Sequence, residues 1–373
     1  MNPQRLVSSA LAVVLLALAG PLSGCAGPGA AAASRPPAAN ELSFPPEEVV
    51  ATPLDVELAG KNDEELFALG TAAFGAAEFP RAAGAFARVV DLFPSSKHLA
   101  AALYNAGLAY QRTGQWALAQ ERFLALEKDY EGPDAVEASF RVAECLYHQD
   151  ELDAARTKLD QIAARPALPP AEKVRALAQR GVVELELGRG EQAEATLRAA
   201  LSAYQVAVGD ERLDEYYAAQ AQYYLGEVYR GWFRALPLDP SRGDEAALTT
   251  QLEQKAEMLL SAQGHYLRAI RYGNDAWAVA SGFRIGELYD GLRAQMLDAP
   301  LPPGLDEEEA GAYRAELRRK LKVLATKAIT AYEQTLQRAS RSGVDDLRFL
   351  ADAQASLERL RALLVEDAKS GTM

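Results

Sequence analysis

The side chains of this sequence that could perform chemistry are few and widely separated. Its three histidines are His98, His148 and His265, and of these only His148 has a cysteine close by, Cys145, three residues earlier. Two residues at that spacing share one face of a helix, but they hold a metal ion only when further ligands join them. The sequence contains no glycine-rich phosphate loop, no GxSxG nucleophile motif and no zincin motif. We therefore predict a protein that is not an enzyme and that binds no metal or cofactor.

The second cysteine, Cys25, closes an apolar run at the start of the chain. Arg5 is the only charged residue before it, and the apolar stretch from Leu11 to Leu18 is ended by a Gly-Pro pair. This pattern is typical of a secretory signal peptide and is too short to span a membrane. The residues LSGC, which end at Cys25, resemble the bacterial lipobox. Residues 1–24 are therefore predicted to be a lipoprotein signal peptide.

The lipobox resemblance implies cleavage before Cys25 and attachment of lipid to its thiol. In that family an aspartate after the cysteine usually retains the protein in the inner membrane. Here Ala26 follows, so the resemblance implies an outer-membrane lipoprotein that faces the periplasm. Several acyl chains anchor a protein stably where one chain does not. The alternative is an ordinary signal peptide followed by an incidental cysteine, and in either case we expect Cys145 to be a buried, inert thiol on a packed helix.

The charge of the chain limits its partners. Its formal net charge is −13 at pH 7, which disfavours nucleic acid and direct adhesion to anionic lipid. We therefore expect contact with the membrane through the lipid anchor at Cys25, contact with other envelope proteins, and no small-molecule substrate. Residues 25–61 are rich in Ala, Pro and Gly and lack a helical apolar period. They are predicted to be a flexible tether behind the lipidated cysteine.

From residue 62 onward the sequence repeats itself. Gly70 and Phe86 recur 37 residues later as Gly107 and Phe123. The pattern resembles the tetratricopeptide repeat, a helix–turn–helix unit of about 34 residues in which small residues let neighbouring helices approach. Two weaker copies follow, so residues 62–208 are predicted to form four repeats of an all-α solenoid. Further residues of the pattern are Ala82, Ala119, Ala143, Ala155, Leu159, Gly181, Ala193 and Leu197.

The second half, residues 209–367, follows the same pattern at a longer spacing. The segments YYLGEVY and FRIGELY both look like the first helix of a repeat, but their glycines are 60 residues apart. Ala262 with Tyr266, and later Ala328 with Tyr332, supply the matching second helices. We predict two enlarged repeats with longer helices and a capping helix, with proline-rich loops between them. A disordered tail is expected at residues 368–373.

A stacked helical array presents a long concave surface that is lined by the first helix of each repeat. Tyr104 and Phe140 could belong to that surface or to the core between repeats, and both alternatives stay open. The segment 216–233 holds seven aromatic residues, of which Tyr217 and Tyr224 lie seven apart and so share one face. A core role is favoured for most of these aromatics, although such residues are also common in partner-binding surfaces. The candidate groove residues are Tyr104, Asn105, Phe140, Arg141, Gln179, Tyr217 and Tyr224.

Two functional hypotheses remain. The first is a non-enzymatic scaffold that holds envelope proteins together at the membrane. Residues 63–165 are similar to repeats of lipoproteins in the outer-membrane β-barrel assembly machine and of the Tol–Pal-associated periplasmic coordinator. The second half, with FRIGELY and KAITAYEQTLQRA, looks more like tetratricopeptide lipoproteins of gliding-motility envelope complexes. The alternative hypothesis is a regulator of a cell-wall enzyme that binds peptidoglycan or peptides.

Overall fold

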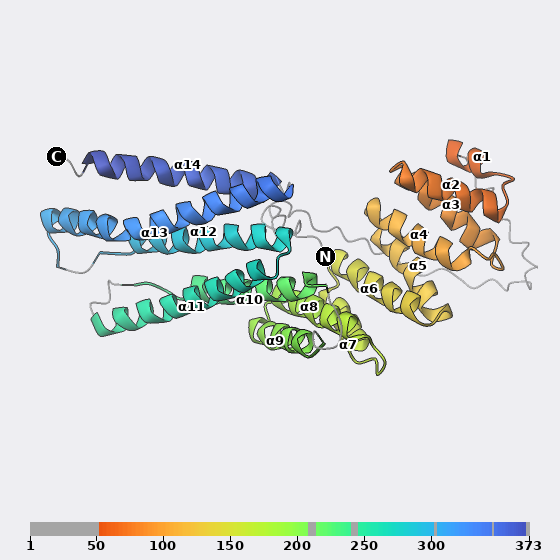
Figure 1. Ribbon diagram of the computed structural model, residues 1–373, viewed down its shortest axis with the longest axis horizontal. Helices are drawn as coiled ribbons and strands as arrows, with labels where there is room; N and C mark the ends of the chain where they lie inside the picture. Colours follow the sequence, from red (N-terminus) through yellow and green to blue (C-terminus); the bar gives the residue numbers. More distant parts are fainter. Residues whose placement is uncertain (1–51, 208–213, 240–244, 302–303, 345–346, 371–373) are drawn as a thin grey trace, which may run out of the picture.

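The computed structural model describes residues 52–370 apart from 208–213, 240–244, 302–303 and 345–346. These residues form helices without any strand (Figure 1). In chain order the helices are α1 (Pro53–Leu58), α2 (Asp63–Gly75), α3 (Phe79–Leu92), α4 (Leu99–Arg112), α5 (Trp116–Asp129), α6 (Pro133–His148), α7 (Leu152–Ala163), α8 (Pro170–Glu186), α9 (Gly190–Ala207), α10 (Tyr216–Ala235), α11 (Glu245–Arg271), α12 (Asp275–Asp298), α13 (Glu307–Ser342) and α14 (Leu347–Ser370).

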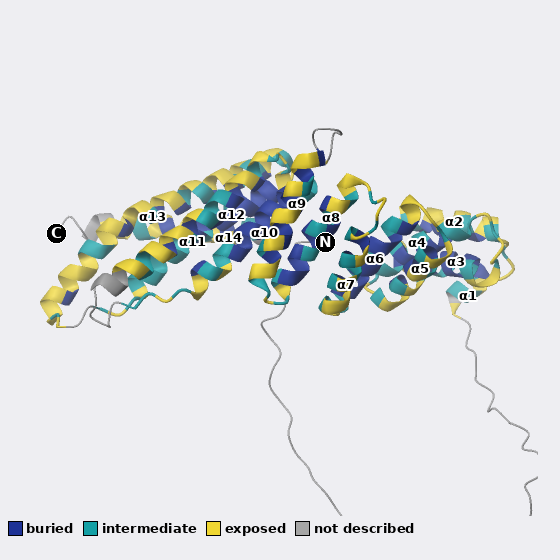
Figure 2. Cartoon of the chain, turned by 90° about the horizontal axis from the view of Figure 1, so that it is seen from below, coloured by how far each residue is buried: buried dark blue, intermediate teal, exposed yellow. Residues whose placement is uncertain are grey.

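Helices α2 to α13 are arranged as a row of two-helix hairpins. The two helices of each hairpin pack together, and each hairpin packs on the next. Figure 1 shows the row running from α2 at one end to α13 at the other, with α14 covering the last hairpin. Figure 2 shows that the buried residues lie along the inside of this row. The predicted all-α solenoid of tetratricopeptide type is thus confirmed, and its longer helices fall in the second half, where α11 has 27 residues and α13 has 36.

Each hairpin is closed by a large side chain of its second helix that lies over a small residue of its first. A methyl group added at Gly107 would lie 2.5 Å from the ring of Phe123, and one added at Gly181 would lie 2.5 Å from Leu197. There is no room for such a group, so the helices approach closely only because the residue is glycine. The third hairpin uses the buried Ala143 instead. The other contacts of this kind are Gly70 with Phe86, Gly226 with Tyr266 and Gly286 with Tyr332.

Each second helix also carries an alanine four residues before its large side chain. Residues at that spacing share one helical face, so the alanine faces the first helix together with the large side chain. These alanines have no exposed surface, which confirms the packing role that the repeat pattern predicts for them. They are Ala82, Ala119, Ala155, Ala193, Ala262 and Ala328.

The N-terminal end of the stack differs from the expected tether, because residues 53–58 form α1 and pack on α3. A capping box starts this helix: the backbone N–H of Asp55 donates to the Thr52 hydroxyl at 3.2 Å, and the N–H of Thr52 donates to the Asp55 carboxylate at 3.0 Å. Leu58 is buried at the end of the helix, and Glu57 forms an ion pair with Arg81 of α3. The helix therefore shields the outer side of α3.

The predicted C-terminal tail lies partly, and the predicted signal peptide wholly, outside the described residues. Helix α14 ends at Ser370, so the first three residues of the expected disordered tail, 368–373, are helical. The signal peptide and Cys25 lie outside the described residues. Their assignment therefore stays a prediction.

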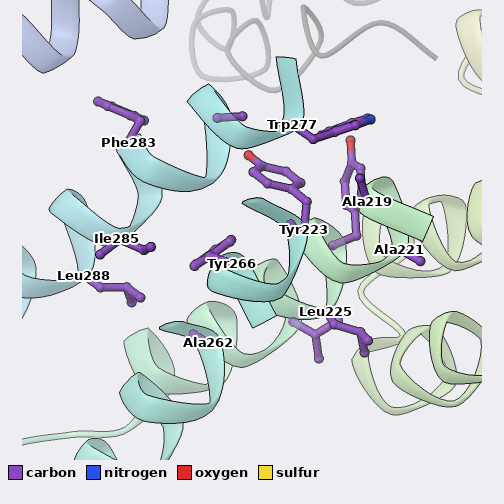
Figure 3. Close-up of a cluster of buried hydrophobic side chains, with 14 of the residues drawn as sticks. Ala219, Ala221, Tyr223, Leu225, Ala262, Tyr266, Trp277, Phe283, Ile285 and Leu288 are labelled. Atoms are coloured by element: carbon purple, nitrogen blue, oxygen red, sulfur yellow. The ribbon is translucent and has the colours of Figure 1, made fainter. Parts of the chain in front are cut away.

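At the large side chain that closes the hairpin, the second half of the stack has a buried polar cluster, whereas Phe123 and Leu197 bring only hydrocarbon to this contact in the first half. The Tyr266 ring covers Gly226, and its hydroxyl donates to Glu227 at 2.5 Å. Glu227 is 7% exposed and accepts from Arg230 at 2.5 Å and from Arg284 at 3.1 Å. Burial raises the pKa of Glu227, but Arg284 and Arg230 together lower it further, so the net shift is downward. Figure 3 shows Tyr223 and Tyr266 meeting between α10, α11 and α12.

A buried histidine also joins α11 to α10. His265 is 5% exposed, and its Nδ1 lies 2.8 Å from the side-chain oxygen of Gln222. Arg268 donates to the same oxygen at 3.2 Å, so this oxygen is an acceptor and Nδ1 carries the proton. The ring stacks on Tyr229 at 5.3 Å. Burial and the nearby Arg268 and Arg198 charges lower the pKa of His265 to about 3, so the folded protein holds it neutral.

The glycine contacts predict opposite effects for two substitutions in the same helix. Gly226→Ala places a methyl group against the Tyr266 ring and should lower the free energy of unfolding by about 1–3 kcal/mol, the usual cost of overpacking. Gly231→Ala, also in α10, meets nothing within 4 Å and should raise it by up to about 1 kcal/mol, because alanine favours the helix. Urea unfolding followed by circular dichroism measures both. Equal effects of the two substitutions would contradict the proposed contact.

The His265 environment predicts acid sensitivity. Below its ordinary pKa of about 6.5, His265 binds a proton when the chain unfolds but not while it is folded. Stability should therefore fall as the pH drops from about 6.5 toward 3, by up to about 1.4 kcal/mol per pH unit. In His265→Gln this contribution disappears, so the loss between pH 7 and pH 5 should be smaller. Tryptophan fluorescence during urea unfolding at both pH values measures it, and an unchanged loss in the variant would refute the assignment.

Candidate functional site

The residues predicted for the groove all lie on the first helices of four successive hairpins. We call this surface the first-helix face. Tyr104 and Asn105 lie on α4, Phe140 and Arg141 on α6, Gln179 on α8, and Tyr217 and Tyr224 on α10.

Burial divides these residues into two groups. Phe140 is 1% exposed, and Gln179 and Tyr224 are each 6% exposed, so these three belong to the interior. For Phe140 this decides the open alternative in favour of the core, because the next hairpin covers its ring. The residues that keep part of their surface accessible are Tyr104, Asn105, Arg141 and Tyr217.

Arg141 is the centre of the polar part of this face. Its guanidinium pairs with Glu137 at 2.8 Å and with Glu144 at 3.0 Å, each one turn away on α6. Burial lowers the pKa of Arg141, but the charges of Glu144 and Glu137 and a hydrogen bond with Tyr104 raise it further, so the net shift is upward. The three charged side chains keep between 25% and 28% of their surface exposed. A partner can therefore reach them without the hairpins separating.

The structure adds Arg175 of α8, which the sequence reasoning missed. Its guanidinium lies 3.9 Å from the centre of the Phe140 ring and 5.8 Å from that of Tyr217, and it pairs with Glu137 at 2.5 Å. Arg175 thus connects α6, α8 and α10. Its position four residues before Gln179 places both on one helical face, and this spacing was a signal that could have found it. Burial raises the pKa of Tyr217 to about 12 despite the nearby Arg175, so its phenol stays neutral.

Asn105 is a polar residue of this face whose side chain has hydrogen-bonding groups available to a partner. It is partly exposed and lies beside Tyr104 on α4. Within the described part of the chain its side-chain amide has no hydrogen-bond partner. An amide offers both a donor and an acceptor, which is what an extended peptide backbone requires. The first-helix face therefore presents an unpaired amide at Asn105 and ion-paired charges at Arg141 to solvent.

The aromatic residues of α10 serve the core. Tyr223 and Phe233 are at most 2% exposed, and Tyr224 packs against Trp277 of α12 with ring centres 5.8 Å apart. Helix α10 contacts α8, α9, α11 and α12. A helix with neighbours on several sides needs apolar residues around most of its circumference. This explains why one helix carries more aromatics than a single stripe requires.

The cysteine and two of the histidines considered above for metal binding or catalysis pack against neighbouring side chains. Cys145 is buried, as expected, and burial raises the pKa of its thiol to about 12, which disfavours the reactive thiolate. His98 stacks on Phe67 at 4.5 Å, and His148 stacks on Trp116 at 3.9 Å. Among the described residues no group of three or more His, Cys, Asp and Glu side chains is placed to hold a metal ion. None of the described helices is long and apolar enough to cross a membrane.

Comparison with known proteins finds one family model and several solved structures of helical repeat proteins. Residues 104–172, which run from within α4 to the first residues of α8, match the family model of the tetratricopeptide repeat. None of the curated proteins matches the chain. Similar solved structures include the apo form of RapI, at 12% identity over 82% of this chain and 99% of that one, with a TM-score of 0.44. Another is a tetratricopeptide repeat protein from Parabacteroides merdae, at 14% identity over 80% and 98%, with a TM-score of 0.37.

The family match and the hairpin geometry agree on the part of the chain that they share. The matched residues include Gly107 and Phe123, which make one of the glycine contacts described above, and Ala143, which takes the place of the glycine in the third hairpin. The chain therefore carries a tetratricopeptide repeat over residues 104–172, and its described residues form an all-helical repeat solenoid of the tetratricopeptide type.

Proposed function

We propose that the protein is a membrane-anchored scaffold that binds segments of other envelope proteins on its first-helix face. The observation that carries this proposal is that the amide of Asn105, unpaired among the described residues, and the partly exposed ion pairs of Arg141 lie on the first helices of neighbouring hairpins. A stack of helical hairpins offers such a face over a long distance, and tetratricopeptide repeats commonly use it for recognition. The absence of a catalytic motif in the sequence is in keeping with a binding role.

The anchor is the second part of the proposal. Residues 1–24 would be removed as a signal peptide, and lipid on Cys25 would hold the protein at the outer membrane on its periplasmic side. The residues between Cys25 and α1 would then set how far the repeats reach from the bilayer. Anchoring raises the effective concentration of partners within that reach, so even a modest affinity for each segment suffices. The envelope process would be of the motility or outer-membrane assembly type.

The anchor predicts the effect of removing the lipidated thiol. Cys25→Ala should shift the protein from the membrane fraction to the soluble or secreted fraction, because no acyl chain can then be attached. Immunoblotting of fractionated cells measures this. Cys145→Ala is the matched control, since it removes the other cysteine and should leave the membrane fraction unchanged. If the Cys25→Ala protein stays membrane-bound, the lipid anchor is wrong.

The binding face predicts where partners crosslink. A photoreactive amino acid in place of Asn105 should form covalent adducts with envelope proteins in the native host, because this position faces the partner. The same residue in place of the exposed Glu121 on α5 should form few. Adding Arg141→Glu to the Asn105 probe should remove the adducts, because the exchangeable ion pairs are lost.

The crosslinked material is identified by mass spectrometry of the purified adducts. Adducts that are equally abundant from both positions would refute the assignment of the face. Stabilisation of the purified protein by muropeptides, with no protein adduct, would favour the alternative role as a peptidoglycan- or peptide-binding regulator.

A further inference from the structure

A second surface lies between the two long second helices of the C-terminal half. Helices α11 and α13 both pack on α12, and between them is a groove of about 850 Å³. Its floor is made of short or buried residues of α12, namely Ala278, Gly282 and Ile285. Its walls are Leu267 and Ile270 of α11 and a row of polar and charged residues of α13.

The groove is separate from the first-helix face. The groove is lined by residues of α11, α12 and α13, whereas the residues of the first-helix face lie on α4, α6, α8 and α10. A partner in the groove would therefore leave the first-helix face accessible.

The rim of the groove exposes large apolar side chains. Leu267 is 39% exposed, and Leu260, two turns earlier on the same face of α11, is 62% exposed. On α13 Val323 is 56% exposed, and it shares a face with the groove residues Lys327 and Thr330. Together these three side chains extend the apolar floor outward on both walls, which is the form of a surface that receives the apolar stripe of a helix.

The charge of the groove is opposite to that of the whole protein. Arg338 pairs with the Asp275 carboxylate at 2.9 Å. Lys327 and Arg341 form no ion pair within the described residues; the Lys327 ammonium lies 5.1 Å from the centre of the Tyr289 ring. The lining thus carries three cations and one carboxylate in a chain of net charge −13. The surplus positive charge is concentrated on α13.

The other wall of the groove, α11, carries negative charge toward its N-terminal end. Glu253 and Glu257 precede Leu260 on the same face of α11, and both are exposed. A bound segment would therefore place its carboxylates beside α13 and keep them away from α11. The part of α13 from Val323 to Arg341 is about 27 Å long, which is about five helical turns. A bound helix of the same length would contact the whole of this wall.

We propose that this groove binds an amphipathic helix of a partner protein, about five turns long, whose apolar stripe is flanked on one side by acidic residues. The apolar stripe lies on Ala278 and Ile285 between Leu267 and Val323, and the carboxylates pair with Lys327 and Arg341. The proposal does not depend on the lipid anchor or on the first-helix face.

The test uses two fluorescent synthetic peptides and the purified full chain. Both are helices of about 18 residues with a leucine stripe; one carries glutamates along one flank, and the other carries lysines at the same positions. Fluorescence anisotropy should show that the acidic peptide binds at least about ten-fold more tightly, with the difference shrinking at high salt. Leu267→Gln should weaken the binding of both peptides, because it removes an apolar contact.

Charge reversal separates the groove from general electrostatics. Lys327→Glu with Arg341→Glu should reverse the preference between the two peptides. Lys128→Glu with Lys173→Glu changes the net charge by the same amount at exposed positions outside the groove and should leave the preference intact. All four side chains are exposed, and circular dichroism checks that the variants fold.

Three results would overturn the proposal. Equal binding of the two peptides, or a control double variant that behaves like the groove variant, would show that the groove does not select acidic helices. A dimer in light scattering that the groove variant disperses would assign the groove to a second copy of the chain. Failure here with persistent crosslinks at Asn105 would leave the proposed scaffold function standing.

Discussion

The structure depends on one steric relation, the close approach of two helices where a small residue of the first lies under a large side chain of the second. Gly107 under Phe123 and Gly226 under Tyr266 are examples from the two halves. This contact fixes the distance within each hairpin, and one hairpin still leaves an apolar side uncovered. Stacking covers it, so the row of hairpins, its buried interior and its two external faces all follow from the same local contact.

The identity of the large side chain distinguishes the two halves of the stack. Phe123 and Leu197 bring only hydrocarbon to the contact, whereas Tyr266 brings a hydroxyl that must find a partner. It finds Glu227, and Glu227 in turn requires Arg230 and Arg284. A single change of ring therefore brings a buried charge cluster with it, and that cluster connects α10, α11 and α12. The longer second helices of this half, α11 and α13, form the walls of the groove on α12.

The spacing of small and large residues was enough to predict the hairpins. Local packing requires a glycine in the first helix and, in the second helix, an alanine followed four residues later by a large side chain. This pattern could therefore be recognised in the sequence of both halves, even where the repeats are enlarged. The exposure of Phe140 and Tyr224 could not be predicted, because it depends on how the next hairpin covers them. Arg175 was missed because its role comes from rings on two other helices. Helix α1 was missed because its stability comes from α3 and not from an apolar period of its own.

Helix α1 also decides how the molecule responds to force. Any pull applied through the residues before Thr52 enters the fold at this six-residue helix, which is attached to α3 by Leu58 and by the Glu57 and Asp55 ion pairs with Arg81 and Arg88. These contacts lie one after another along the chain, so they are loaded in sequence and peel apart singly. Peeling α1 would lengthen the chain while α2 and α3 remain paired. Under such a force we expect α1 to detach before the hairpin of α2 and α3 unfolds.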